Sequence, residues 1–444
     1  MKKILTIFVM SAFIYLIPGR NGPFCQTPLN FQGSFFYNPI LPHGDIDTWE
    51  AAIFLPYVFV HEGTFYIFYS GLNTNWTTGI GFATSTDGYS FTKYSGNPVF
   101  TPSLNGFDSY NVTAGIVIEG QTSWIMYYNG RQISGFGPGP SVGMAMAPDL
   151  TGPWTRDSNP VLTVGSVSEW DDGFISPSNV LPLDTAGFIM FYAAGDADYP
   201  SSIFCQIGMA TSPDGIIWTK YDDPSTTNPP YAESDPVLKV GDQGNWDDKE
   251  VWLCNVQKNG VDYQMYYTGS QGSETAIGYA YSSDGIFWTK HASNPVYTIN
   301  DDPYAVAMGY PPIVEQPAIV YDYDNNTAFM YYDYGITYPG EISIATAELP
   351  IGVRESTKYN FRSTNFPNPV NQSTTFSYAL KETGPVTIQI YNSFRQMVAE
   401  PLNANQPKGE QKVTWDAATL PAGIYFYRIR AGMEVDEGKI MVVK

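Results

Sequence analysis

One block of sequence recurs along most of the chain and limits the folds that it can adopt. The copies read IGFATSTDGYSFTKYSGNPVF from Ile80, VGMAMAPDLTGPWTRDSNPVL from Val142, IGMATSPDGIIWTKY from Ile207, IGYAYSSDGIFWTKHASNPVY from Ile277 and a shortened ISIATAEL from Ile342. Their anchor positions Gly81, Gly143, Gly208, Gly278 and Ser343 lie 62, 65, 70 and 65 residues apart. Because a unit of this size cannot bury a hydrophobic face alone, the units are expected to pack against one another.

Each unit contains the pattern of four short strands. A second shared block, ending in an aromatic strand, precedes each copy: FYIFYSG, WIMYYNG, FIMFYAAG, YQMYYTG and FMYYDYG. Five four-stranded units predict an all-β fold, a five-bladed β-propeller. The segment FFYNPIL at 35–41 matches a last strand without its first three, and the fifth unit lacks its last strand. We therefore expect these two pieces to complete one blade and close the ring.

Loop lengths distinguish the two faces of this propeller. The turns between the first and second strands and between the third and fourth strands are short and hairpin-like, as at Asp87-Gly88 and Asp284-Gly285. The other connections, such as RQISGFGPGPS from Arg131, are long and irregular. Since strands alternate in direction, the long connections share one face, here called the loop-rich face. Functional residues are commonly carried by such loops.

The two ends of the chain have patterns of their own. Residues 1–22 place Lys2 and Lys3 before a short apolar run and predict a signal peptide. After the propeller, at 31–350, and a linker, at 351–358, the residues at 359–444 alternate like strands of a small β-sandwich. This last part resembles the C-terminal sorting domain of the type IX secretion system, through NPV at Asn368, LPAGIYFYRIRAG at Leu420 and the terminal GKIMVVK. The resemblance implies export through the periplasm by this machinery to the medium or the cell surface, with removal of both end segments.

Composition excludes some classes of partner. The formal net charge is −21 and Lys plus Arg number 22, so the broad basic surface that nucleic acid requires is lacking. No membrane-spanning segment is expected in the mature protein. The three cysteines, Cys25, Cys205 and Cys254, are too few for a disulfide framework, although the sequence leaves a bridge between Cys205 and Cys254 open. No metal or other cofactor is predicted, and a structural Ca²⁺ is left open without being predicted.

An aromatic residue followed by an acid recurs where the innermost strands of four blades begin. The acids are Glu50, Asp108, Asp171 and Asp247. Repetition favours a scaffold role, in which the carboxylate accepts backbone N–H bonds in a turn. Glu50 and Asp108 are nevertheless retained as substrate-binding candidates, because they lie at the entrance of the central channel.

Residues that occur in only one or two blades are stronger functional candidates, since the scaffold does not require them. The candidate catalytic acids are Glu250, Glu315, Asp172 and Asp248. Besides Glu50 and Asp108, the candidates for substrate binding are two cations and three aromatic residues that could stack on sugar rings, namely Arg131, Lys249, Tyr110, Trp76 and Trp252. Each candidate also has a structural interpretation without function, in which the acids are hydrogen-bonded within the fold, the cations are solvated and the rings are packed in the core.

The propeller resembles glycoside hydrolase families 43 and 32 and the family 130 phosphorylases. The resemblance rests on the blade number, the repeated Ser-x-Asp-Gly-x-x-Trp and Asn-Pro-Val blocks, and the acids at the loop-rich entrance. The catalytic triad of families 43 and 32 does not carry over. Leu55 precedes Pro56 in blade one, and Thr113 and Ser176 occupy the matching places in blades two and three. Among the starts of the innermost strands, the Glu-x-Pro pattern occurs only at Glu315, in blade five.

Two functions follow as hypotheses. The first is an exported glycoside hydrolase that acts on an oligo- or polysaccharide through paired carboxylates, one protonated and one ionised. The second is a propeller that binds a glycan or a protein without chemistry, which the missing triad favours. A glycoside phosphorylase is a variant of the first hypothesis, with Arg131 and Lys249 as cations for phosphate.

Overall fold

The computed structural model describes residues 26–34, 37–120, 122–132, 139–183, 187–197, 205–259, 262–323, 325–335, 340–349, 363–380, 382–392, 397–431 and 434–444. The chain divides into two compact units, Met1–Pro350 and Ile351–Lys444. The predicted signal peptide and linker, together with Cys25, lie outside the described residues. In the described parts of the chain no helix is long and apolar enough to cross a bilayer.

The first unit is a five-bladed β-propeller, which confirms the predicted fold. Blade 1 contains β2 (Ala52–His61), β3 (Thr64–Leu72), β4 (Thr78–Ser85) and β5 (Thr92–Lys93). Blade 2 contains β6 (Asn111–Glu119), β7 (Trp124–Arg131), β8 (Ser141–Ala147), β9 (Thr155–Arg156) and β10 (Leu162–Thr163). Blade 3 contains β11 (Phe174–Pro182), β12 (Phe188–Gly195), β13 (Gln206–Ser212), β14 (Thr219–Lys220) and β15 (Pro236–Leu238). Blade 4 contains β16 (Glu250–Asn259), β17 (Asp262–Ser270), β18 (Thr275–Ser282) and β19 (Thr289–Lys290).

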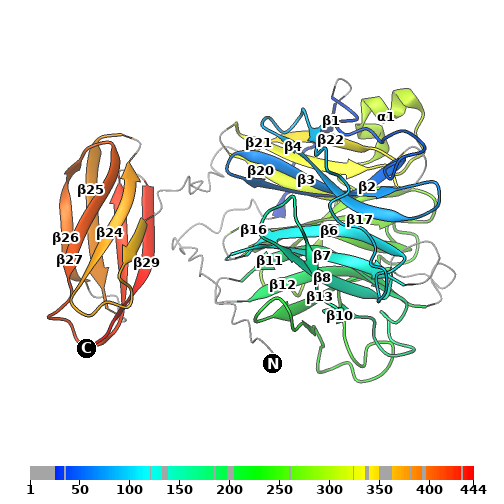
Figure 1. Cartoon of the computed structure of the whole chain (residues 1–444). Coiled ribbons are helices and arrows are strands. Elements are labelled where there is room, and N and C mark those ends of the chain that lie inside the picture. Colours follow the sequence, from blue (N-terminus) through cyan, green and yellow to red (C-terminus); the bar gives the residue numbers. More distant parts are fainter. Residues whose placement is uncertain are drawn as a thin grey trace. The chain divides into compact units, whose positions relative to one another are not determined.

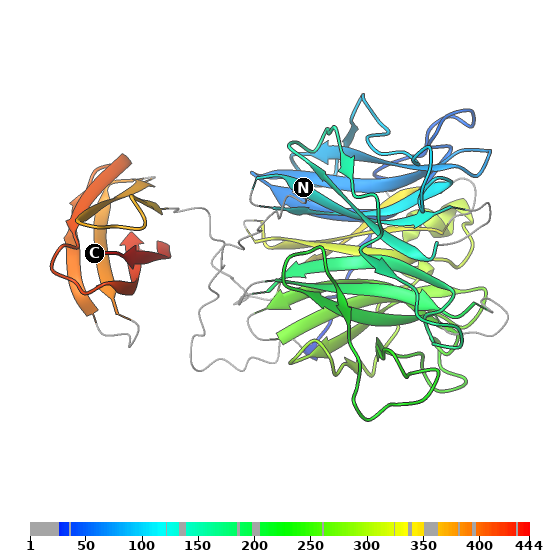
Figure 2. The ribbon, with the colours of Figure 1, turned by 60° about the horizontal axis from the view of Figure 1, so that its bottom comes forward.

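Blade 5 joins the two ends of the propeller. Its sheet has the order β1 (Gln32–Gly33), β22 (Ile342–Glu348), β21 (Thr327–Asp333) and β20 (Glu315–Asp322), so its outer strand comes from the N-terminal side of the chain. The strand that pairs regularly with β22 is Gln32–Gly33, which lies upstream of the predicted segment 35–41. Within that segment, Leu41 forms an isolated bridge to Ile342. The first blade (blue) therefore lies beside the last blade (yellow) in both views (Figures 1 and 2). A short η2 (Ile299–Asp301) and α1 (Pro303–Met308) connect blades 4 and 5.

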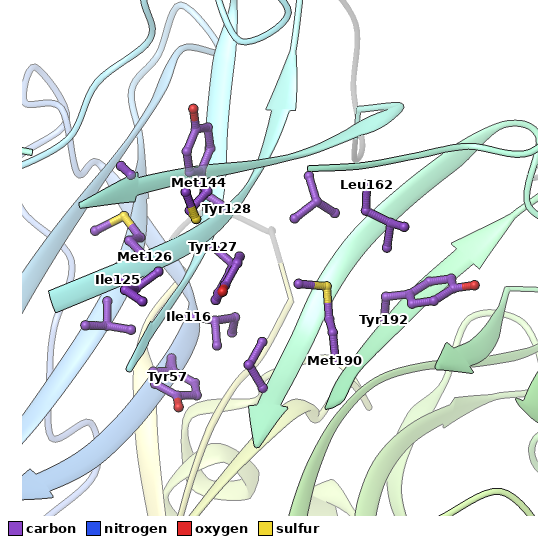
Figure 3. Close-up of a cluster of buried hydrophobic side chains, with 14 of the residues drawn as sticks. Tyr57, Ile116, Ile125, Met126, Tyr127, Tyr128, Met144, Leu162, Met190 and Tyr192 are labelled. Carbon is purple, nitrogen blue, oxygen red and sulfur yellow. The ribbon is translucent and has the colours of Figure 1, made fainter. Parts of the chain in front are cut away.

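The blades pack through a core of aromatic and sulfur-containing side chains. In one cluster, Tyr57 of blade 1 and Met126 and Tyr127 of blade 2 gather with Met190 and Tyr192 of blade 3 (Figure 3). Apart from Tyr57, which is 9% exposed, these side chains have no exposed surface. Burying rings of this size between neighbouring sheets supplies the hydrophobic energy that a single blade cannot supply.

The second unit is the predicted β-sandwich. One sheet has the order β23 (Ser363–Phe366), β24 (Ser373–Leu380) and β27 (Gly409–Asp416). The other has the order β26 (Met397–Gln406), β25 (Gly384–Tyr391), β28 (Gly423–Ala431) and β29 (Glu434–Val442). Phe376, Ile388, Trp415 and Tyr427 belong to the core between them. The alternation of apolar residues that the sequence showed is thus the alternation between a buried and a solvated face.

Cys205 and Cys254 are both buried free thiols, so the bridge that the sequence left open is not formed. Cys205 packs with Phe174 and Leu253, whereas Cys254 belongs to the core cluster that contains Val251 and Val256. Burial raises the pKa of both thiols, which keeps them protonated.

Candidate functional site

The repeated acids are bound within their own blades. Each acid pairs with a cation of the fourth strand: Glu50 with Lys93, Asp108 with Arg156, Asp171 with Lys220, and Asp247 with Lys290. Three of them also accept a hydrogen bond from a tyrosine of the second strand: Glu50 from Tyr69, Asp108 from Tyr128, and Asp247 from Tyr267. Asp171 and Asp247 lie 2.6 Å from their lysines. Glu50 and Asp108, which were substrate-binding candidates, therefore have structural partners.

Asp172 and Asp248, two of the catalytic candidates, lie in the connections between blades and accept backbone hydrogen bonds. Asp172 accepts N–H groups from Ser168 and Ala197, both at 2.7 Å. Asp248 accepts one from Gly244 at 2.7 Å, and its other carboxylate oxygen is buried without a partner in the structure. These contacts are of the kind that stabilises turns.

Glu315 is the first residue of β20 and lies opposite Asp333, the last residue of β21. Glu315 is 9% exposed and Asp333 is fully buried. Burial, the neighbouring Asp333 and Glu250 raise the pKa of Glu315 to about 8, against a smaller opposing effect of the Thr275 hydrogen bond. Burial also raises the pKa of Asp333, to about 7. Two carboxyl groups this close and this poorly solvated do not both ionise readily at neutral pH.

The hydrogen bonds of Asp333 favour its ionised form. Asp333 accepts the backbone N–H of Leu55 at 2.9 Å and that of Gly335 at 2.8 Å. Two such donors stabilise the ionised form of Asp333 and lower its pKa relative to that of Glu315. Around neutral pH the arrangement therefore favours a protonated Glu315 beside an ionised Asp333.

The hydrogen bond between Asp333 and Leu55 also joins blade 5 to blade 1. We call such a bond, from a backbone N–H of one blade to a second-strand side chain of the preceding blade, a clasp. Corresponding second-strand residues bind the next blade in the same way: Ser70 accepts the N–H of Ala114 at 3.1 Å, and Thr268 accepts that of Gln316 at 2.8 Å. The donors Leu55, Ala114 and Gln316 have positive φ angles of 58°, 57° and 61°. Such strained residues persist where neighbouring contacts hold them. Blade 5 thus uses a carboxylate where blades 1 and 4 use a neutral hydroxyl.

Glu250 brings a third carboxylate from the neighbouring blade. It is the first residue of β16, is half-buried, and bridges to Cys205 of blade 3. Its charge contributes to the raised pKa of Glu315. The structure therefore brings together Glu250 and Glu315, the two acids that the sequence placed in different blades, and adds Asp333.

A ring of five corresponding residues shows how blade-specific this site is. In each blade one residue of the first strand lies opposite the second-strand position that Asp333 occupies in blade 5. In blades 1 to 5 these first-strand residues are Phe54, Thr113, Ser176, Trp252 and Glu315. Glu315 is the one acid in this ring. Trp252, in the adjacent blade, is half-buried, and its indole N–H is buried without a hydrogen-bond partner in the structure. An aromatic surface with an unused donor beside a carboxyl group is suited to binding a sugar.

Of the remaining candidates, Lys249 adjoins Glu250, whereas Trp76 belongs to blade 1 and Tyr110 and Arg131 belong to blade 2. Trp76 is 47% exposed in the turn between β3 and β4, and Lys249 precedes Glu250 and is half-buried. Arg131 ends β7, and its carbonyl accepts the N–H of Tyr110 at 2.8 Å. Among the described residues no group of three or more His, Cys, Asp or Glu side chains is arranged to hold a metal ion.

Comparison with known proteins agrees with the two-part architecture. Residues 364–444 match the family model described as "Secretion system C-terminal sorting domain". This type IX sorting domain indicates export, followed by secretion or attachment to the cell surface. No curated protein matches the sequence significantly.

Solved structures similar to this protein have the propeller fold. A glycoside hydrolase is 17% identical, with a TM-score of 0.56, and the match covers 73% of this protein and 92% of that one. A glycosyl hydrolase from Bacteroides ovatus is 16% identical, with a TM-score of 0.52 and coverage of 72% and 94%. The β-1,2-mannobiose phosphorylase of Listeria innocua, solved with β-1,2-mannobiose, is 13% identical, with a TM-score of 0.52 and coverage of 72% and 97%.

These likenesses define the class of fold. The first unit is a five-bladed propeller of the architecture found in glycoside hydrolases and phosphorylases, and it is followed by a sorting domain for export. At such low identities the likeness is one of fold, so the chemistry has to be argued from the site itself.

Proposed function

We propose that this exported propeller is a glycoside hydrolase in which Glu315 is the general acid and Glu250 the second carboxylate. The observation that carries the proposal is the pKa of Glu315, which burial and the charges of Asp333 and Glu250 raise to about 8. A general acid must hold its proton at working pH, and a pKa near 8 meets this requirement. The similar solved hydrolases support the choice of reaction class.

The three acids would divide the work as follows. Glu315 protonates the glycosidic oxygen as the bond to the sugar breaks. Glu250, half-buried at the start of β16, either activates water or attacks the sugar directly. Asp333 is enclosed and bound by Leu55 and Gly335, so it acts on Glu315 through its charge and does not contact the substrate.

Screening of oligosaccharides and polysaccharides, with and without phosphate, tests the proposal. Turnover without phosphate that is lost in both Glu315→Gln and Glu250→Gln supports hydrolysis by these acids. Glu274→Gln is the matched control, because Glu274 is exposed and adjoins Thr275, the residue that hydrogen-bonds to Glu315. Turnover that requires phosphate would indicate a phosphorylase. Glycan binding that survives both substitutions, with no product from any substrate, would overturn the enzyme and leave the recognition module.

A further inference from the structure

A groove on the flank of the ring, between blades 3 and 4, is built from residues that the proposed catalytic site does not use. We call it the flank groove; its lining includes Tyr221, Asp223 and Lys239 of blade 3 and Ile286, Phe287 and Trp288 of blade 4. Its volume is about 420 Å³. Sites for small molecules commonly have volumes of about 300–1,000 Å³. The groove is therefore large enough for one or two sugar rings.

The blade 3 wall of the groove is an insertion that other blades lack. The interval from Gly208 to Gly278, 70 residues, is the longest between repeats, and it contains the segment at 221–235 between β14 and β15. The insertion is fastened at several points. The carbonyl of Pro230 accepts the N–H of Trp170 at 2.9 Å, and Glu169 accepts the N–H of Ala232 at 2.9 Å. The wall is therefore an ordered part of the structure.

A buried acid fixes the near end of the insertion. Asp235 is 4% exposed and accepts the N–H of Asp223 at 2.9 Å and the hydroxyl of Thr226 at 2.7 Å. Asp223 in turn accepts the N–H of Ser225 at 2.9 Å, which orients its carboxylate. The groove thus presents a positioned hydrogen-bond acceptor, as a binding site requires.

The blade 4 wall presents an exposed aromatic ring. Phe287 is 70% exposed at a position of the repeated turn where blade 3 has Ile217, 67% exposed. The turn itself is fixed, because the Asp284 carboxylate accepts the N–H of Ile286 at 2.8 Å and that of Phe287 at 2.9 Å. Since the scaffold leaves this position in solvent in both blades, packing does not explain an aromatic residue there.

The chemistry of the lining suits a neutral sugar. The rings of Tyr221, Phe287 and Trp288 offer apolar faces for the C–H face of a pyranose, while Asp223 and Lys239 offer an acceptor and a donor for its hydroxyls. Two acids, Asp223 and Asp235, and two lysines, Lys239 and Lys290, line the groove. Lys290 is paired with Asp247, which lies behind the lining, so the acids outnumber the lysines. The whole chain also carries −21, so a polyanionic ligand is disfavoured.

We propose that the flank groove binds a neutral saccharide chain at a second site, apart from the Glu250 and Glu315 site. A site of this kind would keep the exported protein on a polysaccharide whether or not the propeller cleaves it. The inference goes beyond the proposed hydrolase activity and does not depend on it.

Affinity gel electrophoresis of the full-length protein tests this site. The gels contain mannan, xylan, arabinan or glucan as neutral polymers and polygalacturonate as a charged comparison, and Glu315→Gln is the background so that no polymer is cleaved. We expect one neutral polymer to retard migration, with about three- to tenfold weaker retardation after Phe287→Ala or Asp223→Ala. The matched control is Ile217→Ala, at the same turn position of blade 3 and outside the groove, which should change nothing.

Several outcomes would overturn the proposal. One is no retardation by any neutral polymer. Another is equal retardation of the Phe287→Ala, Asp223→Ala and Ile217→Ala variants, and a third is retardation by polygalacturonate alone. Retardation that Glu250→Gln abolishes and Phe287→Ala leaves intact would place all binding at the acid site. Since every variant carries Glu315→Gln, none of these results depends on turnover.

Discussion

Glu315 and Asp333 face each other across the β20–β21 ladder, and the Asp333 carboxylate also accepts the N–H of Leu55 in blade 1. One side chain thus closes the ring and acts electrostatically on the proposed acid. The corresponding clasps at Ser70 and Thr268 are neutral, so closing a blade does not require charge. We infer that the charge at Asp333 serves to keep the proton on Glu315.

The first prediction separates these two roles. Asp333→Thr retains an oxygen that can accept the Leu55 N–H, as Thr268 does for Gln316, but removes the negative charge. Without that charge the ionised form of Glu315 is less disfavoured, so the pKa of Glu315 falls and the alkaline limb of the pH–rate profile moves to lower pH by about one unit. A variant whose alkaline limb stays near pH 8 would show that Asp333 is only a clasp. Titration of the Glu315 carboxyl by NMR gives the same answer without turnover.

The second prediction concerns the stability of the clasp. Asp333→Ala leaves the buried Leu55 N–H without its acceptor, and we expect a loss of about 1–3 kcal/mol in the free energy of unfolding. Asp333→Thr should lose less. Chemical denaturation of both variants measures the difference. Equal losses would mean that the hydrogen bond to Leu55 contributes little to stability.

The third prediction is a pH dependence of stability that follows from the raised pKa values. Glu315 and Asp333 have folded-state pKa values of about 8 and 7, above the ordinary 4.5 and 3.8. The folded state therefore binds more protons than the unfolded state between these values, and stability decreases as pH rises from about 4 to about 8. Glu315→Gln cannot ionise, so its melting temperature should decrease less over this range. Thermal melts at several pH values test this, and parallel curves for wild type and variant would contradict it.

The sequence predicted the scaffold better than the site, for a physical reason. Repetition reveals what every blade needs, so the five blades, the ring closure and the sorting sandwich could be read from spacing and alternation. Glu250 and Glu315 were chosen as candidates because they interrupt the repeat, and their roles stay predictions. Asp333 was missed, although FMYYDYG has Asp where the other copies have Ser70, Asn129, Ala193 and Thr268. Its importance depends on burial and on the Leu55 contact, which no spacing shows. The flank groove was missed because its walls come from two blades.

The last prediction compares the acids of NWDDKEVW, at 245–252, which occur within one short stretch but lie in different environments. Asp247 is 2% exposed and holds the ammonium of Lys290 at 2.6 Å and the hydroxyl of Tyr267 at 3.0 Å, whereas Glu250 is half-buried at the site. Asp247→Ala removes the carboxylate partner of the half-buried Lys290 and of the fully buried Tyr267, and should cost about 2–4 kcal/mol in the free energy of unfolding. Glu250→Gln should leave stability within about 0.5 kcal/mol and remove turnover. Denaturation and activity measured on the same preparations test both statements. The reverse ranking, with Glu250→Gln the less stable variant, would make Glu250 a structural residue and remove it from the proposed mechanism.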